Sequence, residues 1–264
     1  DTCYENPRFT LKGSGDDLTC ATKTKAKGNA VYIVDALTGA RLWWTSDSGS
    51  NKDNVDLKHS IVSSISTADG NNDGLVDHLY FGDLGGQVFR IDLNNHTTAT
   101  STADHFAARV VKLVNLATTN KGVSISNGDN PRFYEAPTIT VHRDNGKKFI
   151  HLGLVAGDRS SPLDVAPNER IGLPALLTNR PVNHVYGIMD IDAVKPKIMN
   201  PETVIETKDL TLANLQVNPK LLYATALQLI NSYAPYKTKP LVGLDQRIFG
   251  WYHSLSSTNI RCVH

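Results

Sequence analysis

The sequence predicts an all-β fold, and three observations lead to that prediction. Apolar and polar residues alternate over short runs, as they do in strands with one buried face. Glycine, asparagine and aspartate separate these runs, as they do in tight turns. Two of the runs form similar hairpins about 50 residues apart, an interval typical of blades in a β-propeller. The 264 residues suffice for a single domain of this kind, spanning 1–264.

The first hairpin is predicted in the run GNAVYIVDALTGARLWW, residues 28–44. Over residues 31–34 successive side chains alternate between two faces, which indicates a strand. Asp35 and Gly39 then suit a turn, and residues 41–44 return as a second strand.

The second hairpin is predicted in the run HLYFGDLGGQVFRIDL, residues 78–93. Its DLGG sequence turns the chain, because Gly85 and Gly86 permit the positive φ angles that a tight hairpin needs. In the return strand one face carries Val88, Arg90 and Asp92, and the other carries Phe89, Ile91 and Leu93.

The rest of the chain offers enough strands for roughly four to six blades. They are predicted at residues 107–117, 136–143, 147–158 and 184–192, and a last one begins at Gly250. That last strand has no evident closing partner, so the sequence leaves open whether the propeller is complete within this chain.

One segment, near residues 210–235, departs from the strand pattern and predicts a helical insertion. A helix is expected from about Lys220 to Tyr233, where apolar residues fall close to one helical face. We expect it to pack between blades. The apolar positions are Leu221, Ala224, Leu227 and Ile230.

Composition excludes several classes of protein. Hydrophobic residues make up 40%, charged residues 20%, and the net charge is +1. That balance is ordinary for a globular protein and argues against a nucleic-acid binder. No apolar run approaches the ~20 residues of a membrane-spanning helix. The chain opens on DTCYENPRF without an initiator Met, so it is expected to be a processed piece of a larger protein.

Cysteine spacing leaves two interpretations open. Cys3 and Cys20 could form a local disulfide in an exported protein, and Cys262 would then be unpaired within this chain. In a reducing compartment all three would be thiols. The absence of a CxxC pair argues against a zinc site.

The loop DGNNDGLVD, residues 69–77, holds more acid than a turn requires. Gly74, at position 6 of the loop, permits a sharp turn, and Leu75, at position 7, offers its main-chain carbonyl. This pattern matches the start of an EF-hand loop, whose alternating oxygens bind Ca²⁺. The side chains at positions 1, 3, 5 and 9 are Asp69, Asn71, Asp73 and Asp77.

The loop also departs from an EF-hand. Position 12 is Tyr80 instead of a glutamate, and the residues after Asp77 predict a strand instead of a helix. Three carboxylates this close together repel one another unless a cation is present, which favours Ca²⁺ over a metal-free polar turn. Mg²⁺ suits the loop less well, because it demands a stricter octahedron.

The run DGNNDGLVDHLYFGDLGGQVFRIDL closely resembles the calcium-loop hairpin of the PilY1/PilC family of type IV pilus biogenesis factors and tip-associated adhesins. In that family a D-x-D-x-D-G-x-x-D loop precedes a YxGDLGGxxxRxDL hairpin. Asn71 in this chain replaces the middle aspartate of the loop. The flanking runs GNAVYIVDALTGARLWW and GWYHSL also resemble sequences of that family. The matching hairpin residues are Tyr80, Gly82, Asp83, Leu84, Gly85, Gly86, Arg90, Asp92 and Leu93.

This resemblance implies a modified, C-terminal β-propeller domain of an exported protein, located at the pilus tip or cell surface or associated with the outer membrane. It implies functions in pilus assembly against retraction, twitching motility, virulence, and adhesion to host cells or abiotic surfaces. Minor pilins or other tip components would be its partners. The family's calcium ligands correspond to Asp69, Asn71, Asp73, the Leu75 carbonyl and Asp77.

Two alternatives remain open. The run AVYIVDALTGARLWW also looks like a blade repeat of PQQ-dependent quinoprotein dehydrogenases, although those enzymes repeat it in most blades and this chain has one good copy. The sequence lacks a G-x-S-x-G elbow and an H-E-x-x-H motif, so we expect no enzyme. His59, His78, His142 and His151 are expected in surface or hairpin positions. A purely structural propeller that calcium stabilises is the second alternative.

Overall fold

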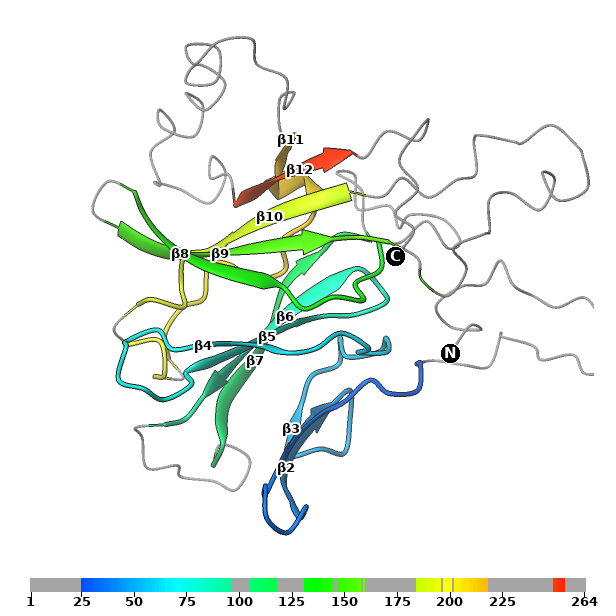
Figure 1. The fold of residues 1–264 in the computed structure, drawn as a ribbon, viewed down its shortest axis with the longest axis vertical. Coiled ribbons are helices and arrows are strands. Elements are labelled where there is room, and N and C mark those ends of the chain that lie inside the picture. Colours follow the sequence, from blue (N-terminus) through cyan, green and yellow to red (C-terminus); the bar gives the residue numbers. More distant parts are fainter. Residues whose placement is uncertain are drawn as a thin grey trace, which may run out of the picture.

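The structure is a computed structural model that contains three β-sheets, stacked one on another (Figure 1). Within the part of the chain that it describes there is one 3-10 turn, no α-helix, and no helix able to cross a membrane. The three cysteines and residues 220–233 lie outside that part. The structure describes residues 25–95, 105–117, 131–144, 147–157, 159, 184–195, 197–200, 202–217 and 249–254.

The first sheet has the order β1-β2-β3. Its strands are β1 (Val31–Val34), β2 (Arg41–Ser46) and β3 (Lys52–Asp53). The turn between β1 and β2 forms as predicted, because the Asp35 carboxylate accepts hydrogen bonds from two turn amides and Gly39 takes a φ of +70°.

The second sheet is an antiparallel meander in the order β4-β5-β6-β7. A four-stranded meander is the unit from which propeller blades are built. Its strands are β4 (Ser66–Ala68), β5 (His78–Gly82), β6 (Gln87–Leu93) and β7 (Ala107–Asn115).

The third sheet has the order β11-β12-β10-β9-β8, with β11 parallel to β12. The 3-10 turn Leu212–Asn214 precedes β11. The strands are β8 (Thr138–Asp144), β9 (Lys147–Val155), β10 (His184–Asp190), β11 (Gln216–Val217) and β12 (Gly250–Ser254).

The second sheet is the middle layer of the stack (Figure 1). Strand β6 is accordingly buried on both faces, from Gln87 to Asp92. Phe89 and Ile91 pack with Phe81, Trp43 and other residues in a core shared with the first sheet. Residues on the opposite face, including Val88, pack in a second core shared with the third sheet. Both cores form because successive side chains of a strand point to opposite faces.

The prediction of an all-β fold is confirmed in its coarse form. Each predicted strand is present, whereas the short strands β3, β4 and β11 were not predicted. The described residues form stacked sheets but no closed ring of blades, so the propeller itself is not confirmed. Residues 210–217, the first part of the segment predicted as a helical insertion, form a β-bridge at Leu210, the 3-10 turn and β11. The helix predicted from about Lys220 to Tyr233 lies outside the described residues.

The end of β5 shows how closely the second sheet approaches the segment that leads into β8. A β-carbon on Gly82 would lie 2.6 Å from the β-carbon of Phe133. Phe133 is fully buried and makes an edge-on contact with Tyr186 of β10, so its β-carbon cannot move aside.

We expect Gly82→Ala to lower the free energy of unfolding by about 1–3 kcal/mol, because the added methyl group overpacks this contact. Gly153→Ala is the matched control, since its β-carbon would meet Thr138 at an ordinary 3.8 Å. The control should be neutral or stabilising by up to about 1 kcal/mol. Urea denaturation of both variants measures the difference. Equal stability of the two variants would contradict a tight contact between Gly82 and Phe133.

Candidate functional site: the loop at residues 69–77 and the buried ring beneath it

The loop between β4 and β5 is organised by its own acidic side chains. The Asp69 carboxylate accepts hydrogen bonds from the amides of Asn72, Asp73 and Gly74. Asn72 and Gly74 take positive φ angles of 67° and 88°, so the sharp turn predicted at Gly74 is confirmed. Carboxylate-to-amide bonds of this kind curve the backbone around the first residue of the loop.

The next two predicted ligands repeat the same local bond. The Asn71 side-chain oxygen accepts from the Asp73 amide at 2.9 Å, and Asp73 Oδ1 accepts from the Leu75 amide at 2.8 Å. The Asn71 amide group also donates to Asp73 Oδ2 at 2.8 Å. All three residues are exposed, so this half of the loop faces solvent.

The last predicted ligand, Asp77, lies beneath the loop. It is 4% exposed, and its Oδ2 accepts from the amides of Gly70 and Asn71 at 2.9 and 3.3 Å. Its own amide donates to Ala68 and its carbonyl accepts from Leu93, so its main chain already belongs to the sheet. Asp77 therefore joins the loop to the sheet.

The chemistry of these donors fits a hard cation, because all five are oxygens. These oxygens do not all point toward one position, since each carboxylate accepts hydrogen bonds from loop amides. In the described ranges, no group of three or more His, Cys, Asp or Glu side chains is arranged to hold a metal ion. A carboxylate offers about four lone-pair sites, so bonds to amides do not by themselves prevent it from also binding a cation. Calcium binding stays a prediction that requires the exposed side chains to turn toward one point.

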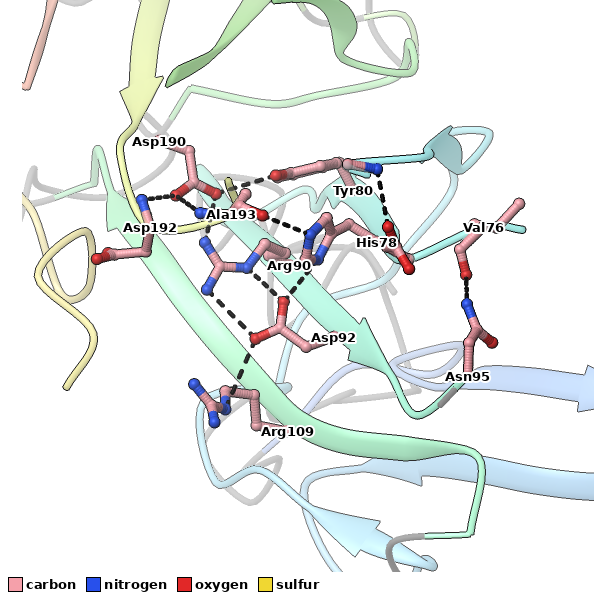
Figure 2. A network of polar contacts seen from close by, with 12 residues as sticks. Val76, His78, Tyr80, Arg90, Asp92, Asn95, Arg109, Asp190, Asp192 and Ala193 are labelled. Atoms are coloured by element: carbon pink, nitrogen blue, oxygen red, sulfur yellow. Dashed lines mark hydrogen bonds and ion pairs between the residues drawn. The ribbon is translucent and has the colours of Figure 1, made fainter. Parts of the chain in front are cut away.

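Directly after Asp77, the side chain of His78 enters a buried polar network (Figure 2). His78 is fully buried, with Nδ1 2.8 Å from Asp92 Oδ1 and Nε2 2.9 Å from the carbonyl oxygen of Ala193. Both ring nitrogens thus face oxygen atoms. Strand pairing explains the first contact, because His78 of β5 lies opposite Asp92 of β6.

Arg90 is the centre of this network, and it too is fully buried. Its Nε donates to Asp92 Oδ1 at 2.6 Å and its Nη2 to Asp92 Oδ2 at 3.3 Å. Its Nη1 donates to Asp190 Oδ2 at 2.5 Å. The guanidinium therefore connects β6 of the second sheet to the end of β10 in the third.

The contacts close into a ring. Asp190 Oδ1 accepts from the amides of Asp192 and Ala193, and the Ala193 carbonyl lies against His78. We call the cycle of His78, Asp92, Arg90, Asp190 and the Ala193 main chain the buried ring (Figure 2).

Further polar groups surround the buried ring. The Tyr80 hydroxyl donates to Asp190 Oδ2 at 3.0 Å. Arg109 of β7 lies 3.6 Å from Asp92 Oδ2. Asp192 accepts from the amide of Thr207 and forms an ion pair with Lys195.

The electrostatic environment favours the charged forms of Arg90 and Asp92. Burial alone would raise the pKa of Asp92, but Arg90 and the hydrogen bond from His78 hold that pKa below its usual value. Burial would lower the pKa of Arg90, and the carboxylates of Asp190 and Asp92 outweigh it and raise that pKa. Burial, reinforced by Asp190, raises the pKa of the Tyr80 hydroxyl, which stays a donor.

The sequence interpretation did not identify this ring. His78 was expected in a surface or hairpin position, and the surface expectation is wrong because Ala193 and Asp92 enclose it. One signal was present, since Arg90 and Asp92 are opposite charges on one face of a strand. Their partner Asp190 lies 100 residues from Arg90, so no local pattern could supply it.

No family model and no curated protein matches this chain. Among solved structures, the chain is similar to the crystal structure of the Pseudomonas aeruginosa PilY1 C-terminal domain. The TM-score is 0.51 at 19% sequence identity, and the match covers 89% of this chain and 46% of that one. The likeness shows a related fold, and the chain spans somewhat less than half of the domain it matches.

We expect Arg90→Met to lower the free energy of unfolding by about 3–5 kcal/mol, because it leaves two buried carboxylates without their cation. Arg143→Met is the matched control, since Arg143 is exposed on β8. That control should change stability by no more than ~0.5 kcal/mol. Chemical denaturation measures both variants, and an Arg90→Met protein as stable as the control would contradict the role of the pair.

The lowered pKa of Asp92 also predicts a pH dependence. Its contribution to stability is present above the ordinary carboxyl value of 3.8 and is lost as pH falls through the lower folded-state value. Asp92→Asn should therefore show a shallower loss of unfolding free energy than wild type between roughly pH 5 and pH 2. Denaturation curves at several pH values give the two slopes. A steeper acid slope in the variant would contradict the prediction.

Proposed function

We propose that this chain is a non-enzymatic, calcium-binding domain of a type IV pilus biogenesis or tip protein. The observation that carries the proposal is the loop at residues 69–77, with its alternating oxygen donors, followed directly by the β5–β6 hairpin.

The local geometry supports the calcium part of the proposal. The loop is already curved by hydrogen bonds to Asp69 and Asp77, so fewer backbone angles remain to be fixed when an ion binds. Asn71 and Asp73 are exposed and can turn without disturbing the sheet. Ca²⁺ accepts variable geometry and suits such a loop better than Mg²⁺.

Two features support the pilus part. The hairpin resembles that of the PilY1/PilC family, and the structure explains the matching residues: Arg90 and Asp92 form the buried ion pair. The fold likeness to the P. aeruginosa PilY1 C-terminal domain is the second feature. In this proposal the domain is exported to the pilus tip or cell surface and works with minor pilins or other tip components. It supports pilus assembly against retraction, twitching motility and adhesion to surfaces.

Calorimetric titration with CaCl₂ tests the site. We expect saturable binding to the wild-type chain and at least about a tenfold weaker affinity for Asp73→Ala, which removes one charged ligand. Asp35→Ala is the matched control, because Asp35 also accepts hydrogen bonds from turn amides but lies in the β1–β2 turn. The control should bind as wild type does.

A second measurement separates a switch from a stabilising ion. Asp73→Ala is placed in the parent pilus protein, and piliation and twitching are scored beside the melting temperature of the domain. Changed motility with an intact fold supports a regulatory ion, whereas a lower melting temperature alone supports a structural one. A wild-type chain that takes up no calcium would refute the proposed site.

A further inference from the structure

The calcium loop and the turn after β10 meet at His78 and Gly70. His78 follows the last loop ligand and contacts the Ala193 carbonyl at 2.9 Å. Gly70 of the loop lies close to the same carbonyl group. A β-carbon on Gly70 would be 3.4 Å from each of three atoms: Ala193 O, Asp77 Oδ2 and His78 Nε2. The base of the loop thus rests on the turn Asp190–Lys195.

The turn is held from its other side by the same ring. Asp190 Oδ1 accepts from the Ala193 amide, and Arg90 ties Asp190 to Asp92, which faces the second ring nitrogen of His78. The imidazole therefore has two fixed contacts on opposite edges. A side chain fixed at both edges also fixes the backbone of its neighbour, Asp77.

We propose that His78 is a positioning residue for the calcium loop. It holds the Asp77 carboxylate in place beneath the loop and couples occupation of the loop to the turn Asp190–Lys195. The inference rests on the proposed calcium function and extends it. An ion bound in the loop between β4 and β5 would also stabilise the turn that follows β10 of the third sheet.

Two substitutions separate the contacts of the imidazole. A glutamine amide reaches about where Nε2 lies and can still donate to Ala193, whereas an asparagine amide reaches about where Nδ1 lies and can still bond Asp92. Both variants keep a buried polar partner, so both are expected to fold. Tyr80→Phe is the control for the loss of another buried hydrogen bond to the turn, because the Tyr80 hydroxyl donates to Asp190 and its removal leaves both contacts of His78 in place.

Hydrogen exchange measured by mass spectrometry, with and without Ca²⁺, reads the coupling. In wild type and Tyr80→Phe, calcium should slow exchange both in residues 69–77 and in residues 190–195. In His78→Asn, the effect on 190–195 should disappear, while His78→Gln should retain it in part. Calcium affinity should fall about tenfold in His78→Asn, as for other residues that orient a metal ligand.

A calcium-free comparison tests the mechanical link by itself. Asp77→Ala should speed exchange in residues 190–195, because Asp77 holds Gly70 against the turn. Asp73→Ala should leave that exchange unchanged, because the Asp73 carboxylate is exposed and bonds to Asn71 and Leu75 in the outer half of the loop. Equal exchange in these two variants would overturn the coupling.

The outcomes distinguish the two proposals. If calcium protects residues 69–77 of wild type but not 190–195, or if His78→Asn behaves as wild type, the role of His78 is wrong and the calcium site stands. If calcium changes neither segment and titration shows no binding, the proposed function fails and the positioning role fails with it.

Discussion

The arrangement of the two larger sheets depends on the burial of one guanidinium group between two carboxylates. Arg90 is fully removed from water and donates to Asp92 within its own sheet and to Asp190 in the next. A buried charge costs several kcal/mol unless its partners are well placed, so alternative registers of the sheets are strongly disfavoured. The pair therefore acts more on the specificity of packing than on its strength.

The two faces of the middle sheet contribute differently to the strength and to the specificity of packing. On the side of the first sheet, Trp43, Phe81 and Phe89 pack in an apolar cluster, which stabilises contact in many orientations. On the side of the third sheet, the middle sheet carries both the buried ring and an apolar cluster that includes Tyr80 and Val88. Directional bonds fix the angle and register there, while the apolar residues supply most of the favourable free energy. Blade-like sheets that share similar apolar faces need such a feature to pack in one way.

Local sequence patterns predicted the features that depend on neighbouring residues, namely hairpins and turns. The hairpins at β1–β2 and β5–β6 follow from alternation and from glycines at turns, and both are present. Strands β3, β4 and β11 have two or three residues each, too few to show a period. The parallel bridge between Leu210 and Val114 joins residues 96 positions apart in the sequence, so no local pattern could predict it. The candidate ligands of the loop could be named from their spacing, but the burial of Asp77 could not.

The position of Asp77 bears on how an ion could act in this loop. Its Oδ2 already accepts from two loop amides and its backbone already belongs to the sheet, so this end of the loop is formed without an ion. The other end is exposed and bound by local bonds, so an ion would order chiefly the Asn71–Leu75 half. The two halves meet at Gly70, whose contacts reach Asp77, His78 and Ala193 at once. In the proposed coupling, ordering of the exposed half reaches the third sheet through this junction and the buried ring.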